Sequence, residues 1–233
     1  MGLTELIAKA KKTKQTGLNE IQSAQILREI GLNVVDMELA TSEGSALDIS
    51  ERMGFPVVLK AMCSQAVDKV ARHRDGIHTN LRDAQDVQNA YRKITEDVKE
   101  ANRNLVIDGI LVQPMLNSAP EILIRLQRNG PFGAMVSFGL GRVAVDILED
   151  VSYRVVPLTA NDASDMIQEV KGRQLLAGYR QWEASDVASV QDILMKLSDL
   201  ATSTPEIAAI ELSPVYAYKD KAIVVDAQIT LEN

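Results

Sequence analysis

The chain has 233 residues, of which 46% are hydrophobic, and its formal net charge at pH 7 is -7. This acidic balance argues against a nucleic-acid partner, which would select a surplus of basic residues. No apolar run approaches the roughly 20 residues of a membrane span, so we expect no membrane association. The single cysteine, Cys63, excludes an internal disulfide framework and suits a reducing compartment, which favours a cytoplasmic protein.

The spacing of apolar residues and the turn signals predict an α+β chain. A helix is expected at residues 3–14, as a linker or docking helix with a short apolar face. Further helices, predicted from apolar residues at three- and four-residue spacing, are 20–30, 44–53, 83–101, 162–170 and 184–200. Short apolar runs predict strands at 32–39, 57–60, 77–81, 110–115, 121–127, 134–138, 143–148, 207–212 and 222–225.

One strand ends in a lysine and is the most informative stretch. Gly54 and Pro56 open it, Val57–Leu59 suits a buried pleated surface, and Lys60 follows at the end of the apolar run. An amine at the edge of a hydrophobic sheet needs an anion, and a phosphate is a common one. From this stretch alone, a strand-end lysine that extends its amine to water is the simpler interpretation.

Five motifs in chain order carry a resemblance to a known family. They are Phe55-Pro56-Val57-Val58-Leu59-Lys60, Gly109-Ile110-Leu111-Val112-Gln113, Phe138-Gly139-Leu140-Gly141, Leu175-Leu176-Ala177-Gly178-Tyr179-Arg180 and Glu211-Leu212-Ser213-Pro214. Each motif alone is weak, but five in register over residues 18–231 are specific. The chain resembles an ATP-grasp domain of the subtype found in nucleotide-binding (beta) subunits of ADP-forming acyl-CoA synthetases, the acetate–CoA ligase type related to succinyl-CoA synthetase.

The resemblance implies an ATP-grasp fold in which two α+β lobes clamp ATP or ADP with Mg²⁺. We expect an N-terminal helix or linker at 1–17, an N-terminal lobe at 18–108 and a C-terminal lobe at 109–233. With a CoA-binding, alpha-type subunit, such a chain interconverts acyl-CoA, ADP and phosphate with acid, CoA and ATP through phosphohistidine and acyl-phosphate intermediates. The partner would be a separate chain in a hetero-oligomer or the missing half of a fused synthetase, and its histidine would carry the phosphoryl group.

The resemblance also assigns nucleotide-binding residues. Lys60 matches the family lysine that reaches the phosphates, where a compact charge with rotatable donors suits phosphoryl transfer. Residues of the interlobe hinge, whose main chain reads the adenine edge, match Val112, Gln113 and Met115. The phosphate loop matches Asp75 and Gly76. Glu121 matches a carboxylate that holds the ribose or a metal, and a solvated strand-end glutamate is the alternative.

Three further residues match the magnesium site of the family. Glu211 and Ser213 are two residues apart on a strand and therefore share one face. Asp226 follows on the next strand and can converge with them. Magnesium prefers oxygen ligands of this kind and keeps several waters. The alternative is a polar strand edge that holds no metal.

Four positions depart from the family pattern. Asp68 stands where some members carry a phosphoryl-accepting histidine, so no residue of this chain is a convincing nucleophile. Pro114 removes one N–H from the hinge, Arg142 replaces a glycine, and Ser213 replaces an asparagine. These departures motivate a second hypothesis, a degenerate ATP-grasp module that binds or regulates without catalysis. A third hypothesis is another ATP-grasp ligase that joins a carboxylate to an amine or thiol.

Several other residues have a structural interpretation beside the functional one. Gly139 and Gly141 suit either a close approach of backbone to phosphates or a tight turn. Arg154 and Arg180 match recurrent family arginines, for which we expect structural or subunit-contact roles. His73 and His78 are expected to be loop histidines without a chemical role, and Cys63 a buried, inert thiol.

Overall fold

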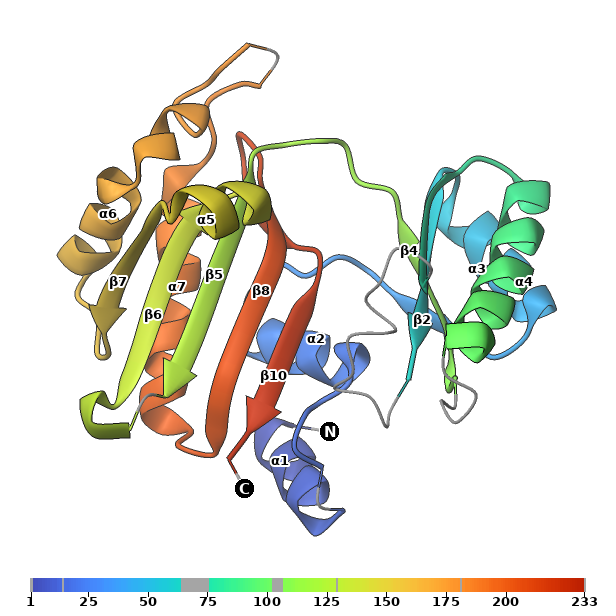
Figure 1. The fold of residues 1–233 in the computed structure, drawn as a ribbon, viewed down its shortest axis with the longest axis horizontal. Coiled ribbons are helices and arrows are strands. Elements are labelled where there is room, and N and C mark those ends of the chain that lie inside the picture. Colours follow the sequence, from blue (N-terminus) through green and yellow to red (C-terminus); the bar gives the residue numbers. More distant parts are fainter. Residues whose placement is uncertain are drawn as a thin grey trace. The chain divides into compact units, whose positions relative to one another are not determined.

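The computed structural model describes residues 2–13, 15–63, 76–101, 107–128, 130–180 and 182–232 (Figure 1). The chain forms two compact units, Val35–Asn117 and a discontinuous one made of Met1–Val34 with Ser118–Asn233. We call them the four-stranded unit and the six-stranded unit, after their sheets. Among the described residues, no helix has both the length and the apolar character needed to cross a membrane.

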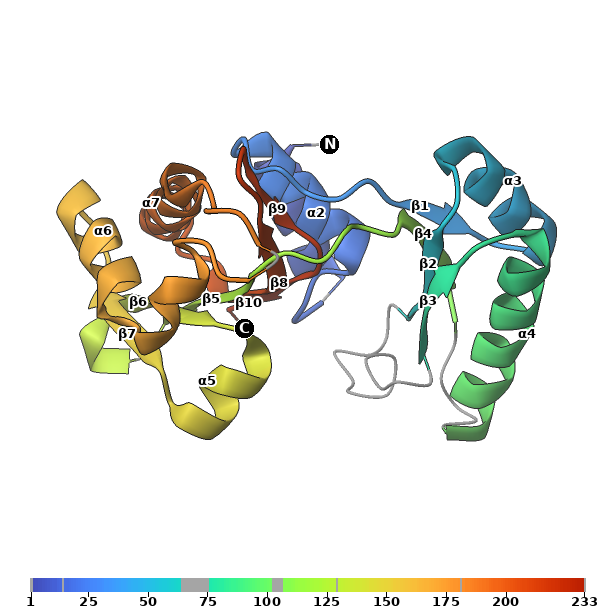
Figure 2. The ribbon, with the colours of Figure 1, turned by 90° about the horizontal axis from the view of Figure 1, so that it is seen from above.

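The four-stranded unit is an antiparallel sheet with two helices on one face. Its strand order is β1 (Glu38–Ala40), β4 (Gly109–Pro114), β2 (Val57–Met62) and β3 (Ile77–Leu81). The helices α3 (Glu43–Met53) and α4 (Ala84–Ala101) cover the same face (Figure 2). The start of α3 follows from a local signal, since the Ser42 hydroxyl accepts a hydrogen bond from the Ser45 N–H in a capping box.

The sequence-based boundary at residue 108 falls inside this unit. The strand β4 follows that boundary directly, yet it pairs with both β1 and β2. Its residues Ile110 and Val112 are buried in the same core as Val57 and Leu59. Pairing with a strand on each side and a shared apolar core therefore place β4 in the same unit as the residues that precede it in sequence.

The six-stranded unit is built on an antiparallel sheet with most of its helices on one face. Its order is β10–β8–β5–β6–β7, with β9 paired to β8. The strands are β5 (Glu121–Arg128), β6 (Ala134–Leu140), β7 (Val151–Val155), β8 (Ile207–Ala217), β9 (Ala222–Val224) and β10 (Ala227–Leu231). The core-side helices are α1 (Leu3–Lys12), α2 (Glu20–Glu29), α6 (Ala160–Glu169) and α7 (Val187–Ser203), whereas α5 (Arg142–Leu148) lies on the opposite face, which we call the open face (Figure 2).

The first helix belongs to the core of this unit and is not a separate linker. Its Leu6, Ile7 and Ala10 are buried in the same cluster as the sheet residues Ile229 and Leu231. The chain then returns to the sheet, where the Leu18 N–H donates to the Ile229 carbonyl oxygen at 2.9 Å. The short apolar face that suggested a linker is therefore the buried face.

The strand predicted at Val143–Leu148 is wrong, because this segment forms the helix α5. Its Val-x-Val-x-Ile pattern alternates like a strand, but Gly141, at φ +68°, turns the chain out of β6. The Val145 N–H then donates to the Gly141 carbonyl oxygen at 3.0 Å, the first helical bond. The edge of the sheet is filled by β7, a strand that the apolar pattern did not reveal.

Two other strands also differ from the prediction. Only the end of the run predicted at 32–39 lies in a strand, β1. Val34 belongs to the six-stranded unit, where it forms an isolated bridge to Val224. The strand β10 was not predicted, although its burial alternates regularly from Ala227 to Leu231. Its polar residues Gln228 and Thr230 weaken the apolar signal in sequence, because one of its faces is not part of the core.

Candidate functional site

Lys60 is a buried residue of a central strand. Its residue is 7% exposed, and it pairs with Leu111 on one side and Ile77 on the other. Since its neighbours Leu59 and Ala61 face the helices, Lys60 points to the opposite face of the sheet. The structure therefore contradicts the solvent-exposed strand-end interpretation. Burial removes water from the ammonium group, so a polar or anionic partner is needed to offset the cost of burying its charge.

The hinge residues divide into core and exposed positions. Val112 is fully buried, and its side chain packs in the core of the four-stranded unit. Its backbone pairs with Glu38 on one side and Leu59 on the other. Gln113 is buried on the face that carries Lys60, whereas Met115 is 39% exposed. The Met115 N–H donates to the Pro56 carbonyl oxygen at 2.9 Å. The amide that the hinge interpretation offers to adenine is thus already engaged within the unit.

The predicted phosphate loop lies mostly outside the described residues. Gly76 is described and buried directly before β3, but Asp75 and Asp68 are not, and neither is His73. The described histidine, His78, lies on β3 opposite Leu59 and is half-buried. The departure at Asp68 therefore stays a prediction from sequence.

A row of polar side chains crosses the open face of the six-stranded sheet. The strand registers place Gln228, Glu211, Arg125, Ser137 and Tyr153 next to one another on β10, β8, β5, β6 and β7. On β10, β8, β5 and β6 the neighbours of these residues along the strand are buried in the core, so strand alternation points the row away from α7. The row is therefore a polar strip on a sheet whose other face is apolar.

The centre of this row is an ion pair. The Arg125 Nε donates to Glu211 Oε2 at 3.0 Å, and the two side chains are 28% and 25% exposed. Arg125 was not singled out in sequence, although a cation in the middle of Glu121–Arg128, with Ile124 and Leu126 on either side of it, was an available signal. Glu211, a predicted metal ligand, is thus bound to a resident cation.

The other two predicted metal ligands are brought together by the backbone. The Ser213 N–H donates to the Asp226 carbonyl oxygen at 3.1 Å. Ser213 and Glu211 are both half-buried beside buried Leu212, and Asp226 directly precedes buried Ala227. Alternation therefore directs Glu211, Ser213 and Asp226 to the same open face. Their convergence on a metal stays a prediction.

The donor chemistry of this set suits Mg²⁺ but does not complete a site. Two carboxylates and one hydroxyl are hard oxygen donors of the kind that magnesium binds. Within the described ranges, no group of three or more His, Cys, Asp and Glu residues is arranged to hold a metal. The set therefore fits an ion that keeps most of its other ligands as water or ligand oxygens.

Glu121 lies apart from the ion pair, at the start of β5. It is exposed and pairs with Tyr216 on β8. Burial raises the pKa of Tyr216, and the charge of Glu121 raises it further. The Glu121 carbonyl oxygen accepts a hydrogen bond from the Gly141 N–H at 2.7 Å. Its described contacts are those of a strand-end residue.

Gly139 has a packing role under α5. A Cβ added to it would lie 2.4 Å from Val145 Cγ2 and 3.0 Å from the Asp150 carbonyl oxygen. Only a glycine lets this helix approach β6 so closely. Around Gly141 there is open space, so its positive φ serves the turn.

Arg128 and Arg154 make structural contacts. Arg128 donates to the carbonyl oxygens of Ile207 at 2.8 Å and Thr204 at 3.2 Å, which ties β5 to the start of β8. Arg154 donates to Glu169 at 3.0 Å, and this contact raises the pKa of Arg154 and lowers that of Glu169. The structural role expected for Arg154 agrees with this pair.

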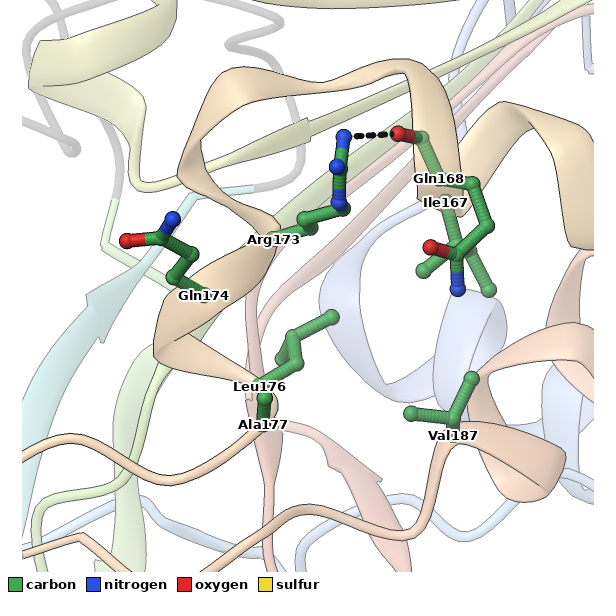
Figure 3. Close-up of a pocket in the computed structure, with 7 residues that line it drawn as sticks. All are labelled: Ile167, Gln168, Arg173, Gln174, Leu176, Ala177 and Val187. Atoms are coloured by element: carbon green, nitrogen blue, oxygen red, sulfur yellow. Dashed lines mark hydrogen bonds between the residues drawn. The ribbon is translucent and has the colours of Figure 1, made fainter.

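Two hollows in the six-stranded unit contain none of the predicted site residues. The first, of about 160 Å³, is lined by Ile167, Gln168, Arg173, Gln174, Leu176, Ala177 and Val187 (Figure 3). In it, Arg173 donates to the Gln168 carbonyl oxygen, and the aliphatic side chains form the walls. The second, of about 310 Å³, lies between α1 and the end of α7. Arg173 lines the first hollow and Lys11 and Glu206 line the second, but no residue predicted to bind nucleotide or metal lies in either.

The chain has two α+β units, one with a buried lysine on its sheet and the other with oxygen donors on its sheet. The chain belongs to the ATP-grasp family, whose domain model matches residues 9–231. It is 34% identical over 227 residues to the beta subunit of acetate–CoA ligase (ADP-forming) I of Pyrococcus furiosus, and the match covers 97% of each chain.

The chain is also similar to a longer relative and to solved structures. Acetate–CoA ligase (ADP-forming) I of Archaeoglobus fulgidus is 32% identical, and the match covers 88% of this chain but 30% of that protein. The dinucleotide-forming acetyl-coenzyme A synthetase 1 of Ca. Korarchaeum cryptofilum, solved with coenzyme A and Ca-AMPCP, is 40% identical with a TM-score of 0.92, covering 98% of this chain and 99% of that one. Another structure of that synthetase holds Mg-AMPPCP, with a phosphohistidine segment pointing towards the nucleotide binding site.

Proposed function

We propose that this chain is the ATP- and ADP-binding, beta-type subunit of an ADP-forming acyl-CoA synthetase, a ligase. The observation that carries the proposal is the end-to-end match to an acetate–CoA ligase beta subunit, which covers 97% of both chains. The buried position of Lys60 supports it, because a lysine that served only solubility would not be placed in a central strand. The acyl group is not specified by any residue described above.

Within this proposal, the four-stranded unit contributes contacts to the nucleotide. Lys60 would hold a phosphate by its charge, and Gly76, directly before β3, would let the backbone come close to a phosphate. Gln113 and Met115 lie beside the adenine, whose edge is read by hinge groups other than the Met115 N–H, since Pro56 already accepts from that amide.

The metal is proposed to bind at the open face of the six-stranded sheet. Glu211, Asp226 and Ser213 would hold Mg²⁺, with Ser213 contributing directly or through water. Bound there, the ion neutralises charge on the phosphoryl oxygens during transfer. The chain's own residues orient the donors, because the Ser213–Asp226 backbone contact fixes two of them side by side.

The CoA-binding part of the reaction is proposed to lie on a partner. The fused Archaeoglobus relative is more than three times as long as its matched region, which leaves room for such a part in that protein. The Korarchaeum synthetase was solved with coenzyme A and has a phosphohistidine segment. We therefore assign this chain a CoA-binding, alpha-type partner that supplies the histidine, in a cytoplasmic hetero-oligomer.

The test is ATP synthesis from acetyl-CoA, ADP, phosphate and Mg²⁺, measured with the chain alone and with the CoA-binding subunit of the same organism. Synthesis only in the mixture, and its loss with Lys60→Met in this chain, is the expected result. ATP turnover by the isolated chain, well above background, would contradict this division of labour.

A second candidate function is a nucleotide-binding module without catalysis. The specific observation in its favour is that both the Met115 amide and the Glu211 carboxylate are engaged by groups of the chain itself. Nucleotide binding with no synthesis in the mixture would support this second function over the first.

A further inference from the structure

The metal site proposed above contains a cation of the protein itself. Arg125 binds Glu211 through its Nε at 3.0 Å, and both side chains are only about one quarter exposed. Partial burial weakens solvent screening, so the charge of this guanidinium acts strongly on any ion that approaches Glu211. Arg125 is therefore part of the electrostatics of the site and not a distant surface charge.

The position of Arg125 is fixed by strand register. It lies directly opposite Glu211 on β8 and Ser137 on β6. Its strand neighbours Ile124 and Leu126 are completely buried, which anchors this part of β5 against the core. The guanidinium cannot leave the open face without disrupting the sheet, although its long side chain can turn to a different partner on that face.

Glu211, Asp226 and Arg125 together carry one net negative charge. A free divalent cation would be repelled by the guanidinium and would have to compete with it for the Glu211 carboxylate. A metal–nucleotide complex does not meet the same opposition. When its metal displaces the Arg125 guanidinium from Glu211, the guanidinium can donate hydrogen bonds to the phosphate oxygens instead. The same arginine thus opposes the free ion and favours the ion that arrives with phosphates.

We propose that Arg125 controls the order of loading, so that Mg²⁺ enters the site as its nucleotide complex and not as the free ion. The inference rests on the proposed function for the identity of the site, while the role of Arg125 follows from its ion pair with Glu211. Arg125 acts here as a positioning residue that holds Glu211 when no metal is bound and exchanges its partner when the complex arrives.

The test measures binding of Mn²⁺, an ion that accepts the same oxygen ligands, from the loss of its free electron paramagnetic resonance signal without nucleotide. Arg125→Gln is expected to bind Mn²⁺ about tenfold more tightly than the wild-type chain, because one like charge is removed at short range. The gain should disappear in the double variant Arg125→Gln/Glu211→Gln. An equal Mn²⁺ affinity for wild type and Arg125→Gln would overturn the proposal, and so would a gain that persists in the double variant.

Arg92→Gln is the matched control. Arg92 also holds a glutamate by two hydrogen bonds, to Glu43 at 2.8 Å and 2.7 Å, but at an exposed place in the other unit. This variant loses the same charge and should bind Mn²⁺ like the wild-type chain; a gain equal to that of Arg125→Gln would contradict a local effect. Circular dichroism checks folding, and Arg125→Met, which keeps the apolar stem of the side chain, replaces Arg125→Gln if the latter unfolds.

The two proposals fail in different ways. If ADP does not bind at all, the proposed function is wrong, yet the Mn²⁺ comparison still decides whether Arg125 limits access to Glu211. If ADP binds, adding it should raise the Mn²⁺ affinity of the wild-type chain by a larger factor than that of Arg125→Gln. Equal factors would contradict ordered loading while leaving nucleotide binding intact.

Discussion

The backbone N–H of Ser213 and the carbonyl oxygen of Asp226 are joined by a hydrogen bond of 3.1 Å. This contact extends the β8–β10 ladder by one residue beyond the Leu212–Ala227 pair. It fixes the side chains of Ser213 and Asp226 on one face of the sheet, next to Glu211. The proposed metal site therefore depends on main-chain geometry that substitutions of these side chains should preserve.

Ser213→Asn is expected to strengthen Mg²⁺-dependent ADP binding severalfold. An amide oxygen is a better magnesium ligand than a neutral hydroxyl, and the backbone contact to Asp226 does not involve the side chain. Calorimetric titration with ADP at fixed Mg²⁺ measures the change. Ser137→Asn, on the same open face but on β6, is the control, and an equal effect of both substitutions would exclude Ser213 from the site.

Gly139→Ala should destabilise the six-stranded unit by about 1–3 kcal/mol, because the new Cβ would overlap Val145 and crowd the Asp150 carbonyl. Urea unfolding measures the loss. Gly44→Ala is the control, since nothing lies within 4 Å of a Cβ at this position of α3. It should raise stability by roughly 0.5–1 kcal/mol. Equal effects of the two substitutions would contradict the packing of α5 described here.

Cys63 is expected to react slowly with thiol reagents at pH 8. Burial, and then the charge of Asp108, raises the pKa of its thiol to about 11, because both disfavour the thiolate. At pH 8 only about one molecule in a thousand is ionised, and the labelling rate should rise about tenfold per pH unit towards pH 11. Iodoacetamide labelling followed by mass spectrometry measures this rate. Labelling at pH 8 as fast as in urea would show that the thiol is accessible and unperturbed.

Lys60→Met should weaken ADP binding at least tenfold, or about 1.4 kcal/mol, because it removes the phosphate contact but keeps a long side chain in the sheet. Calorimetry measures the affinity. Lys93→Met in α4 is the control, as Lys93 is an exposed lysine of the same unit that pairs with Asp97. If both variants bind ADP like the wild-type chain, Lys60 does not contact the nucleotide.

Much of the fold could be predicted because local signals agree with it. Asn19 caps α2 with a capping box, as its place before an apolar-periodic run predicts, and Gly31 follows the helix at φ +78°. The segment Val143–Leu148 was mispredicted because its alternation favours a strand, whereas the turn at Gly141 and packing on Gly139 select a helix. The helix at Val143–Leu148 is therefore selected by tertiary contacts, which leave no periodic pattern in the sequence.

The candidate site residues were proposed only where a motif marks them. Glu211, Ser213 and Asp226 were proposed from their spacing and family match, and the strand register places them on one face, while their role stays a prediction. The burial of Lys60 was not predicted, because a strand's position within its sheet is set by pairing with distant residues. Arg125 was missed for the same reason, since its partner lies 86 residues away in the chain.

Calorimetric titration of the purified chain with ADP, with and without Mg²⁺, tests the central claim most directly. The account predicts magnesium-dependent binding in the micromolar range, about -8 kcal/mol. No detectable heat at millimolar ADP with Mg²⁺ present would contradict a nucleotide-binding subunit.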